Sequence, residues 1–192
     1  MQHVECSART GQHVVLALAL MTVAILAGCT APGHAASHPP TAAPSATPTA
    51  EQRISALAQH AAGLPDKSVT ATFDGGLEGT LTLIATIGGP VPGTKAEIAA
   101  AQERVKAICF LMERAVWTSS MPSGVLLSEV KVAVVGPIYD DYADLTTGPY
   151  GAADLKAATA HQLDWTHLTP DAAWGVYATW LRPAYRSAVV GL

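Results

Sequence analysis

Residues 94–118 read TKAEIAAAQERVKAICFLMERAVWT, and this stretch decides the fold class. Thr94 followed by Glu97 has the spacing of a capping box, in which each side chain bonds the other residue's backbone N–H at a helix start. Apolar residues then recur at intervals of three and four: Ile98, Ala101, Val105, Ile108, Cys109, Met112 and Val116. This spacing predicts a helix over 95–118 that buries one face.

The segment before this helix predicts a β-hairpin. Residues 69–73 alternate apolar and polar side chains, and a second alternation follows over 77–87. The residues between them include Asp74, Gly75 and Gly76, a composition typical of tight turns.

The segment after the helix, residues 127–135, is rich in β-branched side chains and predicts a third strand. A strand-helix-strand crossover packs its helix back onto the sheet. We therefore expect an α+β domain with a three-stranded mixed sheet, ordered strand-strand-helix-strand in sequence and packed by the long helix. Further helices are expected at the N-terminal side (50–62) and the C-terminal side (152–163 and from 169 onward), the last with Trp174, Tyr177 and Trp180 on one face.

Composition and charge narrow the functional classes. The chain has 192 residues, of which 49% are hydrophobic and 14% charged, with a formal net charge of −4. A protein that binds nucleic acid by neutralising phosphates normally carries the opposite bias, so no nucleic-acid partner is expected. The mean hydropathy of +0.27 requires a strongly apolar segment somewhere in the chain.

That apolar segment is residues 14–25, which are shorter than the about 20 residues of a membrane-spanning helix and fit the apolar part of a signal peptide. The next residues are Leu26-Ala27-Gly28-Cys29, and here the sequence resembles the lipobox of bacterial lipoproteins. The resemblance implies that residues 1–28 are a lipoprotein signal peptide and that the sulfur of Cys29 is acylated. Two acyl chains on this residue would give stable attachment to a membrane. The location that the resemblance implies is the extracytoplasmic face of the cell membrane.

Residues 29–50 follow as a tether. From Thr30 to Ala50 the chain contains five prolines and no Lys, Arg, Asp or Glu, a composition that cannot bury enough surface to fold. The remaining residues, 51–192, form the single globular domain. Cys109 is the one cysteine left there, so no disulfide within the domain can form.

The loop over 88–95 resembles a phosphate-binding loop but lacks groups that such a loop needs to bind phosphate. Thr94 and Lys95 stand in the reverse of the required order, and Pro90 and Pro92 remove two amide donors. No nucleotide is expected.

Three carboxylates, Asp140, Asp141 and Asp144, follow the third predicted strand. A solvated acidic turn is the default interpretation. Calcium is the alternative, because it prefers carboxylate oxygens, although the spacing differs from the calcium loop of EF-hands. Apart from Ca²⁺, no cofactor is expected.

Large aromatic side chains concentrate after Ile138, and Tyr139, Tyr142 and Tyr150 are the candidate binding residues, because tyrosine is favoured at recognition surfaces. We interpret the protein as a noncatalytic binding or assembly module whose partner is an envelope protein or glycan. The alternative is an envelope hydrolase of glycan or phosphoester. It would use the Asp140, Asp141 and Asp144 cluster, assisted by His161 or His167.

Overall fold

A computed structural model describes residues 47–75, 79–121 and 125–185. The chain divides into two units, residues 1–44 and 45–192, and the described residues belong to the second. The predicted signal peptide, Cys29 and nearly all of the predicted tether lie outside the described residues.

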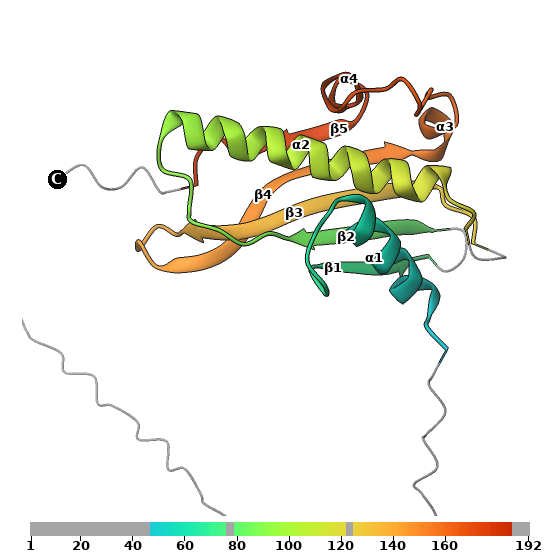
Figure 1. Ribbon diagram of the computed structural model, residues 1–192, viewed down its shortest axis with the longest axis horizontal. Helices are drawn as coiled ribbons and strands as arrows, with labels where there is room; N and C mark the ends of the chain where they lie inside the picture. The colour runs from blue at the N-terminus through green and yellow to red at the C-terminus, as the bar shows by residue number, and fades with distance from the viewer. Residues whose placement is uncertain (1–46, 76–78, 122–124, 186–192) are drawn as a thin grey trace, which may run out of the picture. The chain divides into compact units, whose positions relative to one another are not determined.

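The domain is built on one five-stranded sheet in the order β1-β2-β3-β4-β5 (Figure 1). β2 and β3 are parallel, and every other neighbouring pair is antiparallel. The expectation of a three-stranded sheet is therefore wrong, although the predicted hairpin is confirmed as β1 and β2. The strands are β1 Val69–Asp74, β2 Thr80–Thr86, β3 Glu129–Tyr139, β4 Leu145–Lys156 and β5 Ala178–Leu181.

The two longest helices of the described residues are α1, Ala50–Ala61, and α2, Lys95–Thr118. Both begin with a capping box, and the bounds predicted for the long helix are confirmed. In α2 the amide of Glu97 donates to Oγ1 of Thr94 over 3.2 Å, while the Glu97 carboxylate accepts the Thr94 amide over 2.8 Å.

The C-terminal helices predicted over 152–163 and beyond 169 are wrong in extent. Residues 145–156 form β4, and helix α3 covers Ala157–Ala160 only. The run Gly151–Lys156 favours a helix locally, but its ladder with β3 overrides that preference. Likewise α4 covers Pro170–Trp174, and the chain then enters the edge strand β5, so Trp180 lies on a strand.

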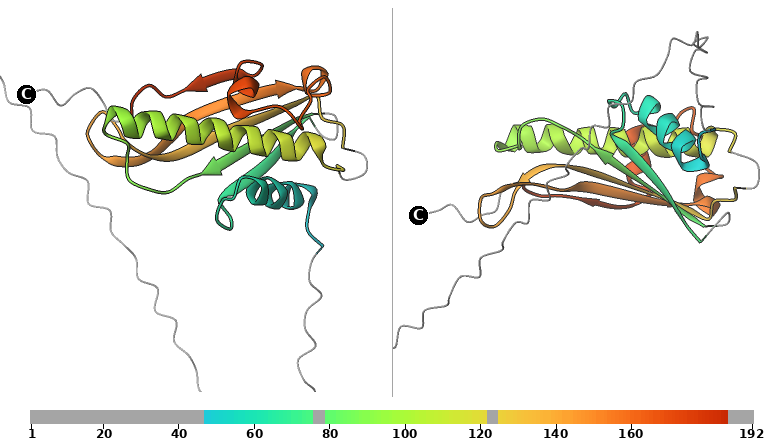
Figure 2. Two further views of the ribbon diagram at one scale, coloured as in Figure 1. Left: turned by 45° about the horizontal axis from the view of Figure 1, so that its top comes forward. Right: turned by 90° about the horizontal axis from the view of Figure 1, so that it is seen from below.

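The helices cover one face of the sheet. Figure 2 shows α1 and α2 on the same side of the strands, and α4 packs beside α2. The segment after α3 also reaches α2, since the rings of Phe110 and Trp165 lie 6.3 Å apart. The core lies between these layers and takes every second strand residue: Leu81, Leu83, Ala85, Val130, Val132, Val134, Ala153 and Leu155.

A bulge interrupts β4. Val134 pairs with Gly151 and Val135 with Pro149, so Tyr150 is the extra residue. Its ring turns inward, where it is 3% exposed and packs 4.2 Å from the ring of Tyr185. Its hydroxyl donates to the carbonyl of Pro137 over 2.6 Å, which ties the bulge to β3.

Gly151 allows α2 to approach the sheet closely. A Cβ atom at this position would lie 2.8 Å from Cγ1 of Val105 on α2 and 2.8 Å from the carbonyl oxygen of Trp180 on β5. Neither neighbour is the end of a long flexible side chain, so a side chain here would force the layers apart.

We predict that Gly151→Ala lowers the free energy of unfolding by about 1–3 kcal/mol, the usual cost of overpacking a core. Gly88→Ala is the matched control, because a Cβ there meets nothing within 4 Å. Urea unfolding of both variants checks this. Equal stability of the two would contradict the close packing of α2 on β4.

Candidate functional site

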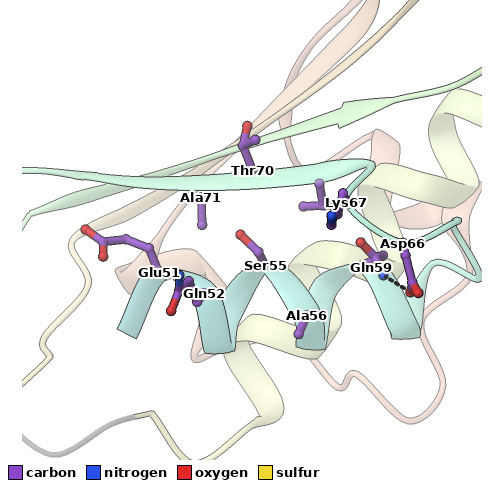
Figure 3. Close-up of a pocket in the computed structure, with 10 residues that line it drawn as sticks. Glu51, Gln52, Ser55, Ala56, Gln59, Asp66, Lys67, Thr70 and Ala71 are labelled. Atoms are coloured by element: carbon purple, nitrogen blue, oxygen red, sulfur yellow. Dashed lines mark hydrogen bonds between the residues drawn. The ribbon is translucent and has the colours of Figure 1, made fainter. Parts of the chain in front are cut away.

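A groove of about 500 Å³ runs between α1 and β1 (Figure 3). Glu51 and Ala71 lie toward one end, and Gln59, Asp66 and Lys67 lie at the other, so the helix and the strand run in opposite directions. The walls are formed by Glu51, Gln52, Ser55, Ala56, Gln59, Asp66, Lys67, Val69, Thr70 and Ala71.

Local sequence explains how α1 comes to lie beside β1. Ile54 and Ala58 are buried one turn apart and hold the helix to the core. Gly63 ends the helix region with a φ of +62°, a conformation that glycine adopts without strain. Nε2 of Gln59 then donates to Oδ1 of Asp66 over 3.1 Å, which fixes the connecting loop against the helix.

β1 is an edge strand of the described sheet, and its free backbone groups can be assigned. The amide of Thr86 donates to the carbonyl of Ser68 over 2.7 Å, and the amide of Ile87 donates to Val135 of β3. In an antiparallel ladder, alternate residues bond the same neighbour. Thr70 and Thr72 therefore face β2, whereas Val69, Ala71 and Phe73 direct their N–H and C=O groups to the open edge beside the groove.

This edge lacks the devices that usually prevent strand addition. Exposed edges are commonly protected by lysine, proline or shortness, and β5 at the opposite edge is four residues long. β1 has six residues, Val-Thr-Ala-Thr-Phe-Asp, without lysine, arginine or proline. It can therefore accept an added strand.

Charge is confined to the ends of the groove. Glu51 lies at one end, and Lys67 with Asp66 at the other. The walls between them carry amide, hydroxyl and methyl groups from Gln52, Ser55, Ala56 and Ala71, whereas the side chain of Thr70 points away from α1. Such a surface suits an extended backbone with small uncharged side chains.

The acidic cluster lies at the turn between β3 and β4. Oδ1 of Asp140 accepts the amides of Tyr142 over 2.9 Å and Asp144 over 3.0 Å, so this carboxylate holds the turn together. Asp141 and Asp144 are exposed. Among the described residues no group of three or more His, Cys, Asp or Glu is arranged to hold a metal ion. Calcium binding remains a prediction.

The structure does not bring the candidate histidines to this cluster. His161 and His167 follow β4, whereas the acidic turn precedes it, and the 12 residues of β4 separate them by about 40 Å. Nδ1 of His167 pairs with Oδ2 of Asp164 over 2.8 Å, an interaction that lowers the pKa of the Asp164 carboxyl. The ring of His161 lies 5.6 Å from that of Trp117. The groups that a hydrolase would need therefore do not converge.

The three candidate tyrosines occupy different environments. Tyr142 is 88% exposed at the tip of the β3–β4 turn. Tyr139 is half-buried at the end of β3, and Tyr150 is buried in the bulge. Tyr150 also reaches a second pocket of about 260 Å³, between the loop 87–92 and Arg104 of α2. The amides of Gly93 and Thr94 beside this loop both donate to the Glu97 carboxylate.

Sequence reasoning missed one buried acid, Glu113. It is 0% exposed, its Oε2 accepts Nε1–H of Trp117 over 2.8 Å, and its Oε1 has no hydrogen-bond partner among the described residues. Burial raises the pKa of Glu113 well above the usual range, the charges of Asp154 and Glu129 add to this effect, and the bond from Trp117 opposes it. Glu113 lies four residues after Cys109 and three before Val116, so it falls within the apolar stripe of the helix. That position is the sequence signal that could have predicted its burial.

The surroundings of Glu113 make it a structural group. Cys109, one turn earlier, is fully buried, and burial also raises the pKa of its thiol. The groove and the pocket beside Arg104 are lined by other residues. A protonated carboxyl and a protonated thiol in an enclosed core have no route to a substrate.

Comparison of the chain with known protein families, with curated proteins and with solved structures finds no match.

We predict that stability falls as pH rises above about 5, because the raised pKa of Glu113 lets the folded state keep a proton that the unfolded chain releases near pH 4.3. Glu113→Gln, which resembles the protonated acid, should flatten this dependence. Glu103→Gln on the exposed side of α2 should leave it unchanged. Urea unfolding across this pH range checks the three proteins, and equal slopes for wild type and Glu113→Gln would contradict the assignment.

Proposed function

We propose that the protein is a lipid-anchored module of the bacterial cell envelope that binds an extended segment of a partner protein without catalysing a reaction. Acylated Cys29 would hold it on the extracytoplasmic face of the membrane, and the groove between α1 and β1 would take the segment as an added strand. The observation that carries this proposal is the open edge of β1 directly beside the groove.

Strand addition supplies affinity through main-chain hydrogen bonds and specificity through alternate side chains. Val69, Ala71 and Phe73 offer three N–H and three C=O groups, by the ladder pattern given above. A bound strand beside them would direct every second side chain toward Ser55 and Ala56 of α1. Small side chains at those positions fit these walls.

The charges at the groove ends favour one direction of binding. A segment antiparallel to β1 begins beside Glu51 and ends beside Lys67. A basic residue at its start would meet the opposite charge of Glu51, whereas the other end carries both signs, from Lys67 and Asp66. A reversed segment would place its terminal carboxylate beside Glu51, where like charges repel.

The tether fits this role. Residues 30–50 are rich in Pro, Ala, Thr and Ser, and at about 3.1 Å per residue such a segment reaches at most about 65 Å. It would let the domain search a volume above the membrane while remaining attached. Within the described residues no helix is long and apolar enough to cross a membrane.

For the anchor, we predict that Cys29→Ala yields an unacylated and uncleaved precursor, because the acyl transfer needs this thiol. Labelling with a palmitate analogue and mass spectrometry of the membrane fraction check this. Cys6→Ala is the control and should be processed normally. Normal acylation and cleavage of the Cys29→Ala protein would contradict the proposal.

For the groove, we predict that nine-residue peptides selected from a phage-displayed library on the 45–192 unit bind the Ser55→Trp variant at least tenfold more weakly than wild type. The indole would fill the groove opposite Ala71. His60→Trp is the matched control, since His60 is exposed on the same helix and does not line the groove.

Fluorescence titration measures these affinities. Selected peptides that bind both tryptophan variants equally, or that shift the NMR signals of residues away from β1, would place the binding site elsewhere.

A further inference from the structure

The face of the sheet opposite the helices carries an ordered pattern of side chains. Four cross-strand neighbours form an apolar row from β2 to β5: Ile84, Ala133, Ala152 and Trp180. Ile84 is 39% exposed and Trp180 is 46% exposed. The two alanines that lie between them have much smaller side chains. Val135 and Pro149, the next pair toward the bulge, extend the apolar area.

On the side of the apolar row that lies away from the bulge, the next two rows of this face are charged. Lys131 pairs in register with Asp154, and two residues further Glu129 pairs with Lys156. In both rows β3 and β4 carry opposite charges, and the signs alternate between the rows. The surface therefore has a two-by-two pattern of charge next to an apolar strip.

We propose that a second copy of this chain packs on this face, about a twofold axis parallel to the strands and midway between β3 and β4. This rotation exchanges β3 with β4 and β2 with β5 while keeping each row in place. Trp180 then lies over Ile84 of the second copy, and Ala133 over Ala152. Aligned sheets pack with a rotation of about 30°, which these side chains can follow.

Charge complementarity favours a second copy as the occupant. The same rotation brings Lys131 opposite Asp154 and Glu129 opposite Lys156, twice each. An axis perpendicular to the strands through the apolar row would instead place Lys131 over the uncharged pair Val135 and Pro149. The pattern of charges therefore selects the parallel axis.

The Asp154 carboxylate is the group that such a dimer would stabilise most. It forms no hydrogen bond or ion pair among the described residues, whereas the Lys131 ammonium already pairs with Glu129 over 3.3 Å. Burial raises the pKa of the Asp154 carboxyl, with the charge of Glu129 adding to the shift and that of Lys131 opposing it. A second lysine from the facing copy would compensate this partly buried carboxylate.

The available area fits a weak, transient pair. The four strands that overlap, β2 to β5, are spaced by about 4.8 Å and are about 20 Å long, so the two facing surfaces have a combined area of about 770 Å², in the range of weak association. The groove lies on the helix side of the sheet, so this interface leaves it open. The inference is therefore independent of the proposed peptide binding.

The test uses the 45–192 unit, which contains every residue of the buried core cluster and so folds on its own. Sedimentation velocity at about 10–200 µM should show a monomer–dimer equilibrium. Trp180→Lys should weaken dimerisation at least tenfold with little change in melting temperature, because Trp180 is outside that cluster. Thr72→Lys on β1 is the control and should still dimerise, since β1 lies outside the overlap of the two sheets.

A charge reversal then separates contacts between copies from contacts within one. Lys131→Asp and Asp154→Lys proteins should each be monomeric, because both pairs between positions 131 and 154 in a homodimer would repel. Their equimolar mixture should form a heterodimer, because both facing pairs become attractive while each chain keeps its own internal repulsion.

A wild-type unit that stays monomeric at 200 µM overturns the inference. So does a Trp180→Lys protein that dimerises normally, which would indicate pairing through the β1 edge, or a mixture that remains monomeric.

Discussion

The close packing of one long helix against one face of the sheet is the constraint on which the rest of the structure depends. α2 lies across the strands at a distance that only Gly151 permits, with Val105 against the backbone of β4. The apolar strand residues that point toward the helices are buried or pack against the core, and the shorter helices fill the same layer. Because nothing in the described chain covers the opposite face, the fold buries a single core and leaves a broad sheet surface in contact with solvent.

In this one-sided arrangement, the groups that stabilise the fold and the groups that can bind another molecule lie in different parts of the domain. The buried side holds the inert groups, Glu113 and Cys109, and it does so without a disulfide. The exposed side and the β1 edge carry the features that can bind another molecule, namely unpaired backbone groups, an apolar strip and charges in register. A binding module of the kind proposed above needs no cleft with reactive groups. The separation of the acidic turn from the histidines along β4 agrees with such a role.

Sequence reasoning succeeded where one local signal decided the structure. The capping boxes and the apolar stripe placed α1 and α2, and strict alternation placed the first hairpin. It placed the helix start at Thr169 and Pro170 but failed for the strands after residue 145. β4 depends on pairing with β3 and β5 on pairing with β4, and the Gly-Ala-Ala-Asp-Leu-Lys run has no strand pattern of its own. The groove was not predictable either. It depends on how the loop after Gly63 returns the chain beside α1, and on β1 being left at an edge once β4 and β5 extend the sheet in the other direction.

The central claim is that β1 presents a free, pairing-competent edge, and amide hydrogen exchange of the 45–192 unit measured by NMR tests it most directly. Thr70 and Thr72 should be protected through their bonds to β2, whereas the amides of Ala71 and Phe73 should exchange much faster, giving alternation along the strand. Uniform protection from residue 70 to residue 73 would show that this edge is already occupied and would contradict the account.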